Sequence, residues 1–97
     1  MRRDEALAIL TAHKDELARF HVKSLALFGS VARDEAGPDS DVDVLVDFEG
    51  SATADRYFGL LFFLEDLLGC SVDLVTSKGV KARVLPYIEQ DLYYVAS

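Results

Sequence analysis

Hydrophobic and acidic residues alternate along residues 41–48, and this alternation is the clearest strand pattern in the chain. Val42, Val44, Val46 and Phe48 fall on one parity, whereas Asp41, Asp43, Leu45 and Asp47 fall on the other. Successive side chains point to opposite faces of a strand, so the first set is predicted to face the core. Short apolar runs at residues 25–28 and 71–76 predict two further strands, and Asp73 interrupts the second of them.

Helical periodicity appears in two longer segments. Residues 4–20 carry apolar side chains at Leu7, Leu10, Leu17 and Phe20 with charges between them, which predicts an amphipathic helix. Residues 53–68 predict a second helix, with Gly69 as the residue that ends it. The second helix is apolar around most of its circumference and therefore needs cover on more than one side. The pattern leaves open whether a partner protein or the chain's own core supplies that cover.

The C-terminal residues complete an α/β arrangement. Pro86 is placed to start a helical turn, and residues 92–96 have strand propensity that favours an edge strand. At 97 residues, of which 51% are hydrophobic, the chain is long enough to bury one core but not two. We therefore expect a single domain spanning residues 1–97.

A Gly-Ser pair follows the first predicted strand and indicates a phosphate site. Gly29 can turn sharply without a Cβ penalty, which allows a phosphate to approach the backbone. Ser30 offers a hydroxyl and is predicted to cap a short helical turn through residues 31–33. Arg33 then either contacts the phosphate or pairs with a nearby acid. The Gly37-Pro38-Asp39 run predicts that the chain reverses before the next strand.

Carboxylates gather on the strands that follow. Asp41 and Asp43 lie two residues apart, roughly 6.5 Å at the Cα level, and so reach the same small volume. Adjacent carboxylates repel each other unless a cation holds them, and hard oxygen ligands suit Mg²⁺. If the Asp73 strand lies alongside, three carboxylates can hold two ions about 3.5–4 Å apart. The alternative is a half-exposed strand whose acids simply face water.

Taken together, the Gly-Ser pair, ten intervening residues and the Asp41-Val42-Asp43 triplet resemble the signature of the DNA polymerase β-type nucleotidyltransferases. In its small size the chain resembles the minimal nucleotidyltransferase branch of this family. Many members of that branch resemble antitoxins encoded beside a HEPN toxin. The resemblance implies a small mixed sheet packed by helices, with Gly29 and Ser30 at the triphosphate of ATP. It also implies that Asp41, Asp43 and Asp73 hold two Mg²⁺ ions. Asp34 departs from the family pattern, in which a small residue, often Gly, is common after the Arg.

Charge and cysteine content limit the classes of partner and the cellular compartments that we expect for this chain. The formal net charge is −7 and the ten basic residues are scattered, so neither DNA nor RNA is expected as the primary ligand. An acidic surface suits a basic protein partner, although the charge can also serve solubility alone. Cys70 is the single cysteine, which excludes an internal disulfide, and we expect it to lie in the core. The sequence shows no signal peptide or membrane-length apolar segment, which predicts a cytoplasmic protein.

The family resemblance and the small size of the chain suggest what kind of molecule accepts the transferred nucleotide. Larger nucleotidyltransferases that resemble this chain carry a second domain that holds the acceptor. The 97 residues are too few for such a domain, so we expect the acceptor to bring its own surface. The leading hypothesis is an antitoxin that transfers AMP from ATP to a hydroxyl, predicted to be a tyrosine, of a HEPN ribonuclease toxin. A second is an antitoxin that acts by occlusion alone. A third is a transferase that modifies a small antibiotic.

Overall fold

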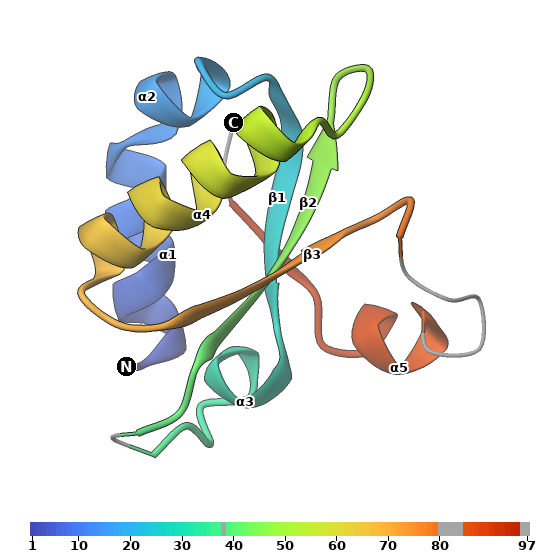
Figure 1. Ribbon diagram of the computed structural model, residues 1–97. Coiled ribbons are helices and arrows are strands. Elements are labelled where there is room, and N and C mark those ends of the chain that lie inside the picture. The colour runs from blue at the N-terminus through green and yellow to red at the C-terminus, as the bar shows by residue number, and fades with distance from the viewer. Residues whose placement is uncertain (38, 80–84, 96–97) are drawn as a thin grey trace.

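The computed structural model describes residues 1–37, 39–79 and 85–95. Helices and strands follow one another in the order α1 (Arg3–Ala12), α2 (Lys14–Ala18), β1 (Val22–Phe28), α3 (Gly29–Ala32), β2 (Val42–Phe48), α4 (Ala54–Leu68), β3 (Val72–Thr76), α5 (Leu85–Glu89) and β4 (Tyr93–Tyr94) (Figure 1). The α/β class, the three predicted strands and the helical turn at Pro86 are confirmed.

A four-stranded mixed sheet forms the centre of the molecule. The strand order is β3-β2-β1-β4, with β2 and β3 parallel and the other two pairs antiparallel. The predicted C-terminal edge strand is confirmed but short, since it comprises two residues that pair with Ala26 and Leu27 of β1. The strands β3 and β4 therefore form the two edges of the sheet, and β2 is central.

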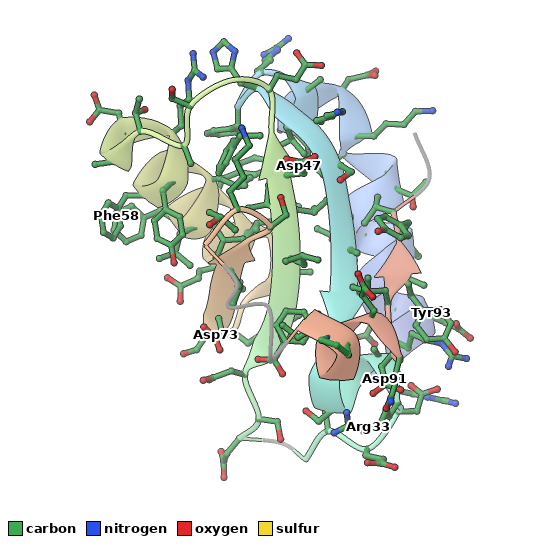
Figure 2. The ribbon with its side chains drawn as sticks, turned by 90° about the vertical axis from the view of Figure 1, so that its right-hand side faces the viewer. Arg33, Asp47, Phe58, Asp73, Asp91 and Tyr93 are labelled. Atoms are coloured by element: carbon green, nitrogen blue, oxygen red, sulfur yellow. The ribbon has the colours of Figure 1, made fainter. Side chains whose placement is uncertain are left out.

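Helices α1, α2 and α4 pack together on one face of the sheet (Figure 1). The core between these layers contains the predicted face of β2, because Val42, Val44, Val46 and Phe48 are all buried. Leu10 and Leu17 contribute from the first two helices, and Leu60, Leu64 and Leu68 contribute from α4. The opposite face of the sheet carries the alternate residues of β2 and β3, Asp43 and Asp73 among them, and faces the viewer in Figure 2.

The prediction of one helix over residues 4–20 is wrong, because the helix is interrupted at His13. The His13 ring donates from Nδ1 to the Ile9 carbonyl at 2.8 Å. That carbonyl is the acceptor that the His13 backbone N–H would use in an unbroken α-helix, and the N–H bonds to the Leu10 carbonyl instead. The side chain thus competes with the backbone ladder, and the chain turns into the short helix α2.

Helix α4 agrees closely with its prediction. The Thr53 side chain accepts a hydrogen bond from the Arg56 backbone N–H, which caps the first turn. Gly69 ends the helix in the left-handed conformation with φ of 71°. The core takes most of the apolar circumference, but Phe58 and Phe62 remain 50% and 63% exposed. The intramolecular core therefore covers part of the helix and leaves this aromatic pair uncovered.

Other predictions concern the chain's loops and single residues. Cys70 is partly buried against the core, in line with its predicted packing role. The predicted turn near residue 38 shows a hydrogen bond from the Ser40 N–H to the Gly37 carbonyl, whereas Pro38 itself lies outside the described residues. Among the residues that the structure describes, none of the helices has the length and apolar character needed to span a bilayer.

Candidate functional site

The centre of the candidate site is a pair of carboxylates on adjacent parallel strands. Asp43 of β2 and Asp73 of β3 are direct register partners. The pairing arises because both strands alternate with period two, so that in this register their acidic residues share a face. Asp43 is partly buried and Asp73 is exposed, on the edge strand of the sheet (Figure 2). The predicted proximity of the two strands is confirmed.

The environment of Asp43 disfavours its charge. Burial raises the pKa of the Asp43 carboxyl above its ordinary value, and the negative charges of Asp73 and Asp41 raise it further. The positive charge of Arg33 acts in the opposite direction and lowers the pKa. Three carboxylates therefore interact here, and Asp41 does so from an exposed position just before β2.

This donor set fits a divalent cation. Each carboxylate is a hard oxygen ligand, and the repulsion that raises the Asp43 pKa is the interaction that a bound Mg²⁺ would remove. Within residues 1–37, 39–79 and 85–95, no three His, Cys, Asp or Glu side chains already stand in a metal-binding arrangement. Binding would thus require the exposed carboxylates of Asp41 and Asp73 to turn toward Asp43.

Gly29 is packed against the Asp43 carboxylate. Its φ is +70°, a conformation that side chains with a Cβ rarely adopt, and a Cβ built at this position would overlap with Asp43 Oδ2. Glycine is therefore required twice here, for the turn after β1 and for the space that the carboxylate occupies. The predicted sharp turn at Gly29 is confirmed.

The predicted cap at Ser30 is wrong. The N-cap residue of α3 is Phe28, with no side-chain capping bond, and Ser30 is the second residue of the helix. The reason is that the turn at Gly29 begins the helix earlier than the Ser30 cap would allow. Ser30 is half-buried, and no hydrogen bond to its hydroxyl occurs within the described part of the chain. Ser30 directly follows the turn at Gly29, and a phosphate contact with its hydroxyl remains a prediction.

Arg33 pairs with two acids in this structure. Its Nε donates to Glu35 at 3.1 Å and its Nη1 donates to Asp91 at 3.1 Å, and Figure 2 shows Arg33 and Asp91 together. The hydrogen bond to Glu35, followed by that to Asp91, raises the pKa of the exposed Arg33 guanidinium. Of the two predicted roles of Arg33, pairing with nearby acids is the one seen in this structure. A phosphate contact remains a prediction, and it is compatible with these pairs, because the guanidinium has five N–H donors and the two bonds use two of them.

Asp34 occupies the position where a small residue is usual in the family. Its φ is +56°, in the region that glycine tolerates most easily and Asp better than most other residues. The Asp34 carboxylate also accepts a hydrogen bond from the Arg3 backbone N–H at 2.7 Å. The departure therefore keeps the local turn and adds a bond to the first residue of α1, whose own N-cap residue, Arg2, makes no side-chain capping bond.

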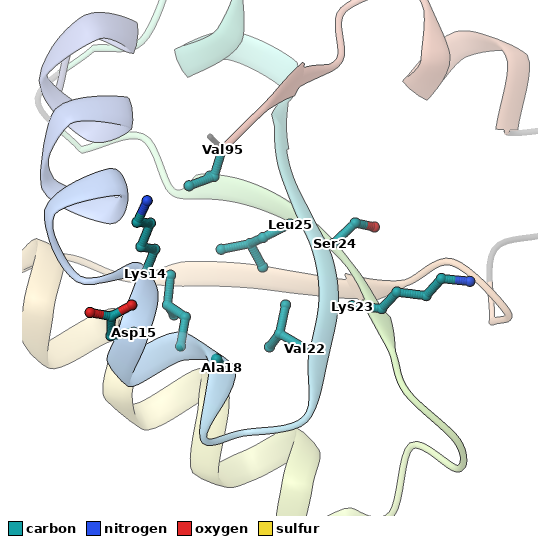
Figure 3. A pocket seen from close by; sticks show the side chains of 9 residues that line it. Lys14, Asp15, Ala18, Val22, Lys23, Ser24, Leu25 and Val95 are labelled. Carbon is teal, nitrogen blue, oxygen red and sulfur yellow. The ribbon is translucent and has the colours of Figure 1, made fainter. Parts of the chain in front are cut away.

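A separate surface pocket of about 340 Å³ lies between α2 and the first half of β1, and Val95 closes one side (Figure 3). Lys14 and Lys23 are among the residues that line it, but none of the residues in the candidate site does so. The acidic site lies elsewhere, toward the β3 edge of the sheet, where Asp73 is exposed.

Three contacts in and around the site were not predicted from the sequence. Asp91 reaches Arg33 across 58 positions, the Tyr57 hydroxyl donates to the Leu74 carbonyl at 2.5 Å, and Glu65 accepts from the Val72 N–H at 3.1 Å. The last two contacts attach α4 to β3, the strand that carries Asp73. No local motif marks these residues, because each contact depends on which elements are neighbours in space.

A mixed sheet that presents paired acidic residues beside a Gly-Ser turn defines a protein of the nucleotidyltransferase class. The model of the nucleotidyltransferase domain family matches residues 10–94. This chain therefore belongs to the nucleotidyltransferase family, in its minimal nucleotidyltransferase branch, and its enzymatic class is that of a nucleotidyltransferase.

Known relatives support this membership. The chain is 44% identical over 93 residues to the protein adenylyltransferase MntA of Thermococcus cleftensis, covering 95% of this chain and 94% of that protein. It superposes on a solved structure described as a proposed minimal nucleotidyltransferase with a TM-score of 0.83 and 35% identity, covering 96% and 95% of the two chains. A chain from the tri-AMPylated Shewanella oneidensis HEPN toxin in complex with MNT antitoxin has a TM-score of 0.61. At 15% identity over 89% of this chain and 71% of that one, this last similarity concerns the fold.

Proposed function

We propose that the chain is an antitoxin that transfers AMP from ATP to a hydroxyl, predicted to be a tyrosine, of a cognate HEPN ribonuclease toxin in the cytoplasm. Its nucleotidyltransferase class follows from family membership. A protein acceptor is supported by the name of the Thermococcus relative, which is a protein adenylyltransferase. A HEPN partner is supported by the similarity in fold to a chain from a complex of an AMPylated HEPN toxin with its antitoxin.

The observation that carries this proposal is the Asp43–Asp73 pair at an open edge of the sheet. Asp73 lies on the edge strand and is exposed, so a hydroxyl that belongs to another protein can approach it directly. A small acceptor would instead need an enclosing pocket to hold it. The pocket between α2 and β1 lacks the acidic residues of the site.

The proposal gives each residue of the candidate site a role. Gly29, Ser30 and Arg33 would bind the triphosphate, and Asp41, Asp43 and Asp73 would hold two Mg²⁺ ions. When bound, the ions would offset the charges of the carboxylates and of the departing pyrophosphate. Gly29 acts by leaving space for the Asp43 carboxylate, which an alanine would displace.

In the proposed transfer, the acceptor oxygen attacks the α-phosphorus of ATP while the bond from that phosphorus to pyrophosphate breaks. Asp73 accepts the proton that the hydroxyl loses, since it is the exposed member of the carboxylate pair. The product is an AMP-modified side chain, which adds bulk and negative charge at the ribonuclease active site. Both changes oppose the binding of RNA, because RNA is itself an anion.

The test is transfer of label from α-labelled ATP, with Mg²⁺, to the protein encoded beside this chain. Wild type is compared with Asp41→Asn/Asp43→Asn, and adducts are located by mass spectrometry. An adduct of AMP mass that forms on the partner with wild type alone is the expected result. Tight binding by both forms without transfer would instead support the antitoxin that acts by occlusion.

Two further measurements separate the alternatives. In cells, Asp41→Asn/Asp43→Asn is expected to lose protection against the toxin while still binding it, whereas an occluding antitoxin would protect equally well. Labelled ATP offered with a panel of hydroxyl-bearing antibiotics is expected to give no product. Turnover on such a drug without any protein partner would overturn the proposed order of acceptors.

A further inference from the structure

We propose that the exposed side of helix α4, defined by Asp55, Phe58, Phe62 and Asp66, docks a partner protein whose complementary surface is an apolar groove bordered by Lys or Arg. We call these four residues the α4 stripe. The inference rests on the proposed function, since it assigns the surface by which the antitoxin holds its acceptor protein.

The aromatic pair at the centre of the α4 stripe is accessible. Phe58 is 50% exposed and Phe62 is 63% exposed, and their rings stack on each other with centroids 6.2 Å apart. Figure 2 shows Phe58 projecting from α4 on the side of the molecule opposite Tyr93. A phenylalanine side chain has two rotatable bonds, so ordering the two rings on docking costs less entropy than ordering longer side chains. Aromatic residues, Phe among them, are enriched in protein interfaces relative to the rest of the surface.

Acidic residues border the pair at both ends. Residues 55, 58, 62 and 66 recur at helical spacing and share one side of α4, and all four are exposed. The last turn of α4 contains no basic residue. An acid near a helix C-terminus is unfavourable for the helix itself, because the macrodipole is negative there. Asp66 makes no hydrogen bond or ion pair within the described parts of the chain, so no contact found there offsets this cost.

The charge pattern excludes a second copy of this chain as the favoured occupant. If two α4 helices packed antiparallel about Phe58 and Phe62, Asp55 of one copy would face Asp66 of the other. Parallel packing would place each acid opposite itself. Both arrangements bring like charges together at the rim of a desolvated contact, which is costly. A partner with basic residues around an apolar groove would bury both rings and pair with both acids. The net charge of −7 would favour its approach.

The experiment measures the affinity of the full chain for the protein encoded beside it by isothermal titration calorimetry at 50 and 300 mM NaCl. Phe58→Ser/Phe62→Ser is expected to weaken binding about 30-fold or more, as for an aromatic hot spot. Asp55→Lys/Asp66→Lys is expected to weaken it about 10-fold at 50 mM NaCl and much less at 300 mM, since salt screens the lost attraction. Tyr94→Ser is the matched control, because Tyr94 is 62% exposed on the far edge strand, and it should bind as wild type.

The charge-reversal variants also show whether weaker binding results from loss of folding. Lys at position 66 complements the macrodipole, so Asp66→Lys alone should raise the melting temperature while it weakens binding. Unchanged affinity of both double variants, or an equal loss with Tyr94→Ser, would overturn the proposal. Self-association of the free wild type that Phe58→Ser/Phe62→Ser abolishes would identify a second copy as the occupant and would also overturn it.

Transfer of labelled AMP, measured in the same samples, distinguishes the two proposals. If wild type modifies the partner and the α4-stripe variants bind normally, the docking inference fails and the proposed function stands. If binding depends on the α4 stripe but no label is transferred, the docking inference stands and the enzymatic function fails.

Discussion

Gly29 and Asp43 depend on each other. Asp43 can lie beside the turn after β1 only because residue 29 has no side chain, and the turn itself needs a positive φ. Asp43 in turn is held where burial and neighbouring acids oppose its charge. Neighbouring carboxylates repel each other when no cation lies between them. Both residues therefore have consequences for stability as well as for activity.

Gly29→Ala is expected to reduce AMP transfer at least 100-fold, because the new Cβ displaces the Asp43 carboxylate. Gly69→Ala is the matched control, since Gly69 has a nearly identical φ of +71° but, apart from its chain neighbours, no described atom lies within 4 Å of a Cβ there. Both variants should lose about 1–2 kcal/mol of unfolding free energy from the left-handed backbone. Labelled-ATP turnover and urea unfolding measure the two effects. Equal activity in the two variants would contradict the packing argument.

Asp43→Asn is expected to stabilise the metal-free protein at neutral pH while it abolishes transfer. Because the pKa of Asp43 is raised in the folded state, that state binds more protons than the unfolded chain between the two pKa values. The stability contribution is therefore complete below the unfolded pKa and is lost as the pH rises through the folded pKa. Asn removes this loss, so the melting temperature should exceed that of wild type at pH 7 with EDTA but not at pH 3.

Asp47→Asn serves as the control for that comparison. It removes one negative charge from the same face of β2, and the amide oxygen can still accept the hydrogen bond that Asp47 receives from Ser77. A similar gain in melting temperature from both variants would attribute the effect to net charge and not to the carboxylate cluster.

At the scale of elements, short segments are held in place by side chains from elsewhere in the chain. Helix α1 receives its capping contact from Asp34, 31 positions later. Strand β3, which carries Asp73, is attached to α4 through Tyr57 and Glu65. Helix α3 is joined to the segment after α5 by the Arg33–Asp91 pair. These contacts set the relative positions of the elements around the acidic site.

Asp34→Ala is expected to lower the free energy of unfolding by about 1–3 kcal/mol. The change removes the hydrogen bond to the Arg3 N–H, and it also places a β-carbon without a polar group in a left-handed conformation. Asp34→Asn should recover most of the loss, because its amide oxygen can accept the same bond and Asn tolerates positive φ. Chemical denaturation of the three proteins measures this order, and equal stability of wild type and Asp34→Ala would refute the capping role.

The whole molecule has an excess of acid over base, with 17 Asp and Glu against 10 Lys and Arg. The described ion pairs involve two arginines, Arg3 and Arg33, both at solvent-accessible positions. Most of the negative charge therefore acts through long-range repulsion, which destabilises a compact state and which salt screens.

Raising NaCl from 20 to 500 mM is consequently expected to affect the free chain and its complex in opposite directions. The melting temperature of the free chain should rise by a few degrees, because self-repulsion is screened. The affinity for a basic partner should fall over the same range, because attraction is screened as well. Differential scanning calorimetry and titration calorimetry give the two trends, and a parallel change in both would contradict the electrostatic account.

The sequence by itself predicted the strands of the sheet, the helix α4 and a candidate acidic site. Alternation over residues 42–48 predicted a strand and its buried face, and Thr53 and Gly69 marked the two ends of α4. Such features depend on local periodicity and on backbone preferences that a residue carries wherever it lies. The acidic residues were likewise recognisable from their spacing.

Only the tertiary structure decided how these elements meet. It broke the first helix at His13, because a ring competes for the Ile9 carbonyl, and it supplied Arg33 with a partner 58 positions away. It also placed β3 in parallel register beside β2, so that Asp73 faces Asp43, and left Phe58 and Phe62 uncovered. The break at His13 is a local competition, since Ile9 lies only four positions away. The other outcomes depend on packing between segments that are distant in sequence, and local periodicity contains no information about which segments become neighbours.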